Sequence, residues 1–270
     1  MTSAFHRPRG VPPGAGSVRH RRVTWRLHPV LTDVLNTLDG TTVGSAFRDR
    51  AVEISTLKVM SDPVDYGSAL TAYRWLLEWA DGDGLPLTAS GYLKPADVRA
   101  LAEVMPTMQY WIFKVTREID VHPVLSFREY LKEIGLLRKY KGTLRLSRAA
   151  RALLGDPAGL WRYLADTLVP DEPQFDADAS VVVLVHMATT DGDIDVNAVA
   201  RTLTELGWAH RDGSGIGSGE VYEVWNDLWD VLGNVGVRSS ARHRDRVLSP
   251  EARILINEAL FAEVDGESAR

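Results

Sequence analysis

Between residues 126 and 146 the hydrophobic pattern changes from a helical period to short strand-like runs. Ser126 is a suitable N-cap for a helix whose apolar residues recur on one side as far as Ile134. Gly135 ends that helix, because glycine adopts the left-handed conformation without a Cβ clash. Residues 136–140 and 143–146 then form two runs that predict short strands.

The dipeptide Lys141-Gly142 lies between these two runs and predicts a tight hairpin turn. Ser147 follows the second run and caps a predicted helix over residues 148–154, which Gly155 ends. A helix, a two-stranded hairpin and a second helix form the second half of a winged helix-turn-helix. The pattern therefore predicts a winged-helix-like unit in this part of the chain.

Outside this stretch the apolar spacing is mainly helical, with a short strand predicted near residues 85–87. Residues 108–115 are apolar and fit either a strand or a helix. Residues 181–185 are β-branched, but their apolar run extends to Ala188, which favours a helix. Further helices are expected within residues 23–81, 95–105, 157–168, 195–206, 220–232 and 250–260.

The central pattern returns about one hundred residues later in the chain, which indicates an internal repeat. Leu146-Ser147 corresponds to Leu248-Ser249, and Gly135 corresponds to Gly236. We therefore expect a mainly α protein with small β-hairpins, built from tandem winged helix-turn-helix-like units. The expected segments are a disordered basic tail (1–22), a helical extension (23–83), unit 1 (84–170), an acidic linker (171–178), unit 2 (179–264) and a tail (265–270).

The bulk composition excludes some classes of protein. A net charge of -5 argues against a protein that coats nucleic acid over its whole surface, although a local basic patch remains compatible with it. The absence of cysteine removes disulfides, thiolate metal sites and cysteine nucleophiles. No apolar run is long enough to span a bilayer, and no secretory leader is evident, so we expect a cytoplasmic protein without a membrane partner.

Positive charge is concentrated where hairpins are predicted. Clustered cations on an exposed hairpin are suited to phosphates, because they release counterions from duplex DNA. The alternative is that basic hairpin edges prevent strand pairing between molecules and form ion pairs with the acidic helices. The candidate nucleic-acid-binding residues are Arg128, Lys132, Arg138, Lys139, Tyr140, Lys141, Arg145, Arg238, Arg242, Arg244 and Arg246.

Two family resemblances accompany this pattern. The run GLLRKYKGTLRLSRAARALL resembles the wing and following helix of MarR-type regulators, over about thirty residues. The longer region that begins LPLTASGYLKPADVRALAE resembles uncharacterised bacterial proteins related to plasmid ORF-3-like, mobile-element-associated families. The first resemblance implies that residues 127–134 are a recognition helix, but Arg128, Glu129, Lys132 and Glu133 largely cancel in charge.

Catalytic and metal-binding patterns are weak throughout the sequence. Asp191, Asp193 and Asp195 resemble the start of a calcium loop, but Val196 stands where glycine is needed, and helix capping explains Asp195 better. We expect no cofactor, no metal site and no enzyme activity. The preferred function is a non-enzymatic DNA-binding or regulatory protein whose basic wings hold double-stranded DNA, and the alternative is a protein-protein interaction scaffold without nucleic acid.

Overall fold

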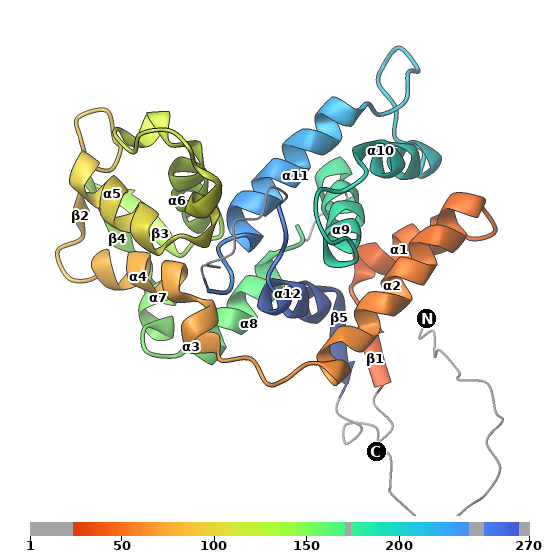
Figure 1. The fold of residues 1–270 in the computed structure, drawn as a ribbon, viewed down its shortest axis with the longest axis horizontal. Coiled ribbons are helices and arrows are strands. Elements are labelled where there is room, and N and C mark those ends of the chain that lie inside the picture. Colours follow the sequence, from red (N-terminus) through yellow and green to blue (C-terminus); the bar gives the residue numbers. More distant parts are fainter. Residues whose placement is uncertain (1–23, 171–173, 238–245, 265–270) are drawn as a thin grey trace, which may run out of the picture.

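The computed structural model describes residues 24–170, 174–237 and 246–264. Within these ranges the protein is mainly helical and contains a small three-stranded antiparallel sheet (Figure 1). The expected tails, the start of the expected linker and the candidates Arg238, Arg242 and Arg244 lie outside the described residues. No helix in the described ranges is both long and apolar enough to cross a membrane.

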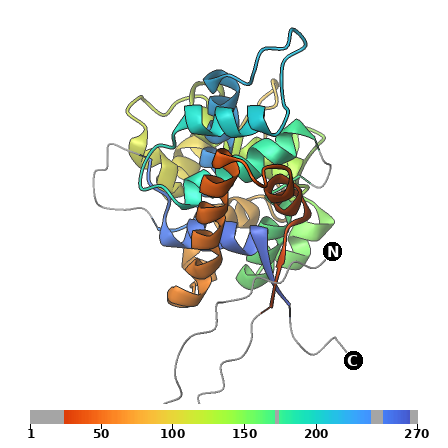
Figure 2. The same ribbon diagram turned by 90° about the vertical axis from the view of Figure 1, so that its right-hand side faces the viewer.

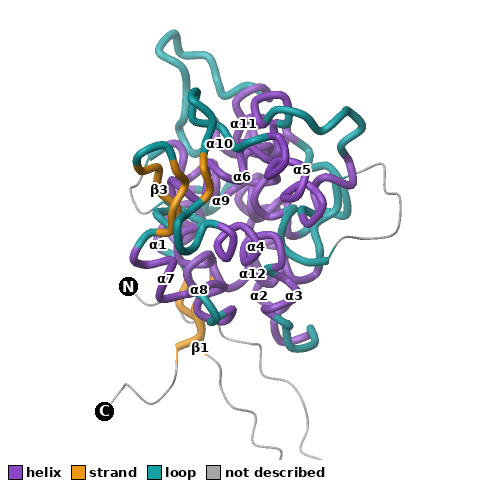
Figure 3. Tube along the Cα trace, turned by 90° about the vertical axis from the view of Figure 1, so that its left-hand side faces the viewer, coloured by secondary structure: helices purple, strands orange, loops and turns teal. Residues whose placement is uncertain are grey.

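The sheet belongs to the first half of the chain and lies at one edge of the helical body (Figure 3). Its strand order is β2-β4-β3, with Leu85 opposite Leu144 and Leu137 opposite Leu146, so one face of the sheet is apolar and buried. The elements of this part are α3 (Tyr66–Ala69), α4 (Thr71–Trp79), β2 (Leu85–Pro86), α5 (Pro95–Val104), η1 (Pro106–Tyr110), η2 (Glu118–Asp120), α6 (His122–Glu133), β3 (Leu137–Tyr140), β4 (Thr143–Leu146), α7 (Arg148–Leu153) and α8 (Pro157–Thr167).

The remaining helices pack around α9 (Phe175–Ala188), in which every residue from Ala179 to Ala188 is buried. A helix that is apolar on all sides needs neighbours on all sides, and α1, α2, α10, α11 and α12 supply them. Strands β1 and β5 pair and extend together from this helical body (Figure 2). The bounds are β1 (Thr24–Leu27), α1 (Pro29–Thr37), α2 (Thr42–Met60), α10 (Val196–Glu205), α11 (Ser218–Leu232), α12 (Pro250–Leu260) and β5 (Phe261–Val264).

Several local expectations differ from the structure. The helical pattern expected from residue 23 is wrong at Thr24–Leu27, which form a strand because Phe261–Val264 pair with them. Residues 108–115 form neither a strand nor an α-helix, but the end of η1 and an irregular loop. Ser126 is not an N-cap, because α6 already begins at His122 with Pro123 in its first turn, where proline needs no N–H partner.

The acidic linker predicted over residues 171–178 is too long, because α9 begins at Phe175. The backbone carbonyl of Gln174 accepts hydrogen bonds from the amides of Ala177 and Asp178, which draws the last residues of that acidic stretch into the helix. The helix predicted from the apolar run up to Ala188 is confirmed.

The two copies of the repeat have the same helix-ending glycine and the same helix-capping serine, but only the first copy has a hairpin among the described residues. Gly135 and Gly236 both have positive φ, at +75° and +106°. Ser147 and Ser249 each cap the next helix by accepting a hydrogen bond at 3.0 Å, from Ala150 and Ala252 respectively. In the second copy, however, Val237 and residues 246–248 form no strand, so the described residues contain only the first hairpin.

Replacing either capping serine by alanine should lower the free energy of unfolding by about 1 kcal/mol, because one amide of the first helical turn loses its acceptor. We expect a larger loss for Ser249→Ala than for Ser147→Ala, since the Ser249 hydroxyl also donates to the carbonyl of Val235 at 2.7 Å. Urea unfolding would measure both. Ser45→Ala, on the exposed side of α2, is the control and should change stability by less than about 0.5 kcal/mol; equal effects at all three positions would contradict the assignment.

Candidate nucleic-acid interface

The β3–β4 hairpin presents the positively charged face that the sequence predicted. Its turn residues Lys141 and Gly142 both have positive φ, at 47° and 75°, as a tight two-residue hairpin of type I′ requires. Lys141 is the only residue other than glycine with positive φ in the described part of the chain. The turn therefore keeps a cation at the tip of the hairpin, although glycine or asparagine would be less strained there.

Three cations surround one exposed aromatic ring on the outer face of this hairpin. Arg138 and Arg145 are directly opposite each other in the strand register. Their guanidinium carbons lie 5.4 Å and 5.8 Å from the centre of the Tyr140 ring, and the ammonium of Lys141 lies 5.3 Å from it. Like charges at opposed positions are destabilising, and cation-π attraction to Tyr140 opposes that repulsion.

Lys139 lies on the other side of its strand, across the turn that follows β2. A Cβ added to Gly91 would be 2.1 Å from the Lys139 ammonium, and Gly91 has φ +85°. The positive φ favours glycine at this position, and the lysine ammonium lies directly against the turn. In the strand register Lys139 is opposite Leu144, so it lies on the other face of the sheet from Arg138 and Arg145.

The basic residues of the hairpin are not neutralised by neighbouring acids. Arg138 donates to the carbonyl of Leu146 at 3.4 Å, and Arg145 donates to the Thr143 hydroxyl at 3.0 Å. Among the described residues, no carboxylate forms an ion pair with Arg138, Lys139, Lys141 or Arg145. The alternative expectation, that the acidic helices pair with these cations, receives no support there.

Arg128 is not a surface residue, and its expected exposure is wrong. It is 2% exposed. Its Nε donates to Glu118 at 2.5 Å, and it also pairs with Glu129 at 2.8 Å. The second oxygen of Glu118 accepts from the amide of Leu93 at 2.6 Å. Arg128 is thus a structural residue that joins α6, η2 and the segment before α5.

Helix α6 is poorly placed to read bases. Lys132 forms an ion pair with Glu129, which cancels its charge. One side of α6 packs against α11, where Nδ1 of His122 lies 3.2 Å from a carboxylate oxygen of Asp230. Burial raises the pKa of Asp230 above its usual range, although the nearby His122 opposes that shift. The helix that corresponds to a recognition helix is therefore partly covered by the second half of the chain.

Arg246 does not project outward as expected. Its guanidinium lies over the rings of Trp225 and Trp229, at 4.9 Å and 5.7 Å from their centres. It also donates to the side-chain oxygen of Asn226 at 2.5 Å. Cation-π attraction to two rings of α11 explains this position. Of the four arginines predicted in the second cluster, the one within the described residues is therefore folded back onto α11.

The acidic residues near α10 have structural roles. Asp195 caps α10, accepting from the amides of Asn197 and Ala198 at 3.0 Å, as the sequence predicted. Asp191 forms an ion pair with Arg253 of α12 at 2.5 Å. Within the described ranges, no group of three or more histidine, aspartate or glutamate side chains is arranged to hold a metal ion.

The family comparison covers the part of the chain that carries the hairpin. Residues 67–159 match the family model described as the Y4jL N-terminal domain, which is named after a plasmid-encoded uncharacterised protein. This range contains the whole three-stranded sheet, from before α4 to the beginning of α8. Neither a curated protein nor a solved structure gives a significant match to the chain.

Proposed function

We propose that the chain is a non-enzymatic DNA-binding or regulatory protein. Residues 71–147 form a winged-helix-like unit in this proposal, and its β3–β4 hairpin binds the sugar-phosphate backbone of double-stranded DNA. The order of the elements supports the unit: helix α4, strand β2, helices α5 and α6, then strands β3 and β4. The sheet order β2-β4-β3 also supports it, because the first strand of a winged helix joins the hairpin at its second strand.

The observation that carries this proposal is the pair of opposed arginines. Arg138 and Arg145 repel each other, and no described carboxylate lies in an ion pair with either. A phosphate would neutralise both and also accept a hydrogen bond from the exposed hydroxyl of Tyr140. Because α6 is charge-balanced and packed against α11, the expected mode is backbone binding with little base readout.

The test is the salt dependence of duplex binding. The affinity for duplex DNA falls as salt rises, with a slope of roughly −0.9 in log affinity against log salt for each phosphate contact. Neutralising Lys139 and Lys141 together (Lys139→Gln with Lys141→Gln) should therefore make this slope shallower by about 1.8. Fluorescence anisotropy with a mixed-sequence duplex at several salt concentrations would measure this slope.

The matched control removes the same charge elsewhere. Arg201 and Arg211 are exposed and lie in α10 and in the loop after it, far from the hairpin (Figure 1). Arg201→Gln with Arg211→Gln should leave the slope almost unchanged. A slope that falls equally in both double variants, or in neither, would reject the hairpin as the binding site.

A further inference from the structure

A cleft of about 780 Å³ lies between helices from the two halves of the chain. Its walls come from the ends of α6 and α8, the beginning of α9 and one side of α11. Spacings of three and four residues place the α11 wall on a single side of that helix, at Val224, Asp227, Leu228 and Val231. The volume lies within the range of about 300–1,000 Å³ that is typical of small-molecule sites.

The charges that line this acidic cleft all have the same sign. Its four carboxylates come from four different helices, and they are Glu133 of α6, Asp166 of α8, Asp176 of α9 and Asp227 of α11. No described lysine, arginine or histidine lines it. None of the four carboxylates forms an ion pair with a described residue. Arg162, one turn before Asp166 on α8, lies outside the lining.

The Asp227 carboxyl shows that this charge is not compensated. Burial and the nearby Glu223 raise its pKa, whereas His122 opposes that shift. The Nδ1 atom of this histidine lies 3.2 Å from a carboxylate oxygen of Asp230, so the ring already has an acidic partner. A cation in the cleft would stabilise the ionised form of Asp227 and bring its pKa down.

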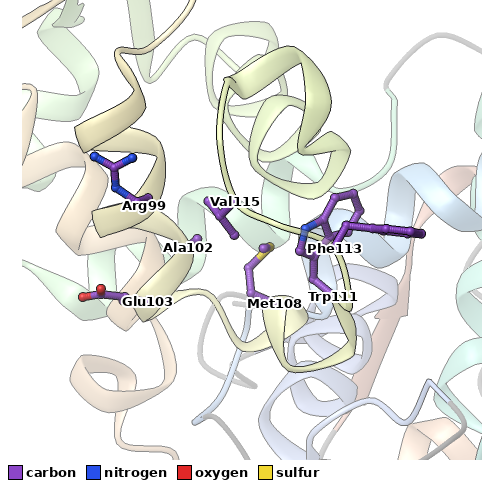
Figure 4. A pocket seen from close by; sticks show the side chains of 7 residues that line it. All are labelled: Arg99, Ala102, Glu103, Met108, Trp111, Phe113 and Val115. Atoms are coloured by element: carbon purple, nitrogen blue, oxygen red, sulfur yellow. The ribbon is translucent and has the colours of Figure 1, made fainter.

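The hollow beside the 111–114 loop provides a contrast (Figure 4). It is smaller, at about 290 Å³, and both Arg99 and Glu103 of α5 line it. These two side chains have opposite charges, so the hollow does not select a ligand by charge. The acidic cleft does, because every carboxylate on its walls favours a positive ligand.

One buried hydroxyl in the wall of the acidic cleft has no partner. Ser180 is 8% exposed and lines the cleft, so the small surface that it exposes faces this space. Its hydroxyl forms no hydrogen bond with a described residue, whereas Thr189, at the end of the same helix, donates to the carbonyl of Val185 at 2.8 Å. A serine oxygen accepts hydrogen bonds, so Ser180 offers a bound cation an acceptor inside the cleft.

The distribution of charge favours a ligand with separated positive groups. In the described ranges, no three acidic or histidine side chains are arranged to hold one metal ion. The carboxylates are instead spread over four helices, and the same walls carry the apolar side chains of Ile134, Leu168 and Leu228. Helices α6 and α8 also end at this cleft, and helix C-termini carry partial negative charge. The positive N-terminal end of α9 is offset by Asp176 in its first turn.

We propose that the acidic cleft binds a linear aliphatic polyamine, a small cation whose ammonium groups are separated by methylene segments. The ammonium groups pair with the carboxylates and donate to the Ser180 hydroxyl. The methylene segments lie against the apolar walls, as the stems of lysine side chains do on protein surfaces. The site is separate from the basic hairpin, and the inference is independent of the proposed function.

The test is calorimetric titration of the full chain with spermidine at low salt, without nucleic acid. Spermidine should bind at one site, at least tenfold more tightly than the monoamine butylamine. Asp166→Asn with Asp227→Asn should weaken spermidine binding at least tenfold. The matched control is Asp33→Asn with Asp49→Asn, which removes two exposed helical carboxylates outside the cleft and should leave binding unchanged. This pair separates the cleft from general attraction to a chain of net charge -5.

A variant without a charge change keeps the test valid if the asparagine variant affects folding. Ser180→Ala should weaken spermidine binding by about threefold to tenfold, because one buried acceptor is lost. No binding of spermidine, or an equal loss in both double variants, would overturn the proposal. Magnesium ions that compete at equal concentration would show a site for any compact cation and overturn it too. A trilysine peptide that binds more tightly than spermidine would assign the cleft to a basic protein segment instead.

Discussion

Replacing Glu118 by alanine should lower the free energy of unfolding by about 3–5 kcal/mol, because it leaves a buried guanidinium without its main partner. Glu118 is fully buried and accepts from both Arg128 and the amide of Leu93. The variant removes both acceptors at once. Only Glu129, whose side chain is 47% exposed, would remain to pair with Arg128. Urea unfolding followed by tryptophan fluorescence would measure the change.

A nearby exposed ion pair provides the control. Arg117 donates to Asp120 through two nitrogens, at 2.8 Å and 3.0 Å, but its side chain is 73% exposed. Arg117→Ala should therefore cost less than about 1 kcal/mol. Similar losses for Glu118→Ala and Arg117→Ala would show that burial does not make the Glu118–Arg128 pair important for stability.

Stability should also fall as the pH is lowered, because of His186 in the last turn of α9. This side chain is 5% exposed, its Nδ1 has no hydrogen-bond partner, and burial lowers its pKa to about 4. In the unfolded chain the histidine has its ordinary pKa of about 6.5. Between pH 6.5 and pH 4 this histidine is therefore protonated in the unfolded chain and neutral in the folded protein, which favours unfolding. The resulting loss of stability is absent well above pH 6.5 and reaches about 2–3 kcal/mol near pH 4.5.

Replacement of this histidine by leucine isolates its contribution. His186→Leu should make the decline in unfolding free energy between pH 7 and pH 4.5 shallower by about 2–3 kcal/mol, while all carboxylates still contribute as before. His210→Gln is the comparison, because His210 lies on an exposed loop, where it pairs with Glu220 at 2.8 Å. If the two variants have the same acid profile, the buried histidine is not responsible for the decline.

The sequence was most informative where structure depends on near neighbours. The hairpin turn at Lys141-Gly142, the helix stop at Gly135 and the caps at Ser147 and Ser249 are each determined by a few adjacent residues, and these are confirmed, whereas the cap predicted at Ser126 is wrong. The exposed basic face followed from the same local pattern. An alternating strand with its leucines buried must turn its arginines toward solvent.

Interactions between distant segments were not predictable in this way. The pairing of Thr24–Leu27 with Phe261–Val264 and the packing of α6 against α11 depend on the whole fold. The burial of Arg128 did leave a signal, because Val124 and Leu131 lie four residues before and three after it, on the same apolar side of α6. No local pattern marks the position of Arg246 over the α11 tryptophans, since Trp225 and Trp229 precede it by 21 and 17 residues.

Strands β1 and β5 hold the beginning and the end of the described fold together, with Thr24 opposite Val264 and Leu27 opposite Phe261. The two ends of the described fold, Thr24 and Val264, therefore lie side by side, on the side away from the basic hairpin (Figure 1). The same geometry suits circular permutation, because a short linker could join the two ends while new ends are opened in the exposed loop at residues 211–215. Labels for binding experiments are best attached beside β1 and β5, away from the proposed hairpin interface (Figure 1).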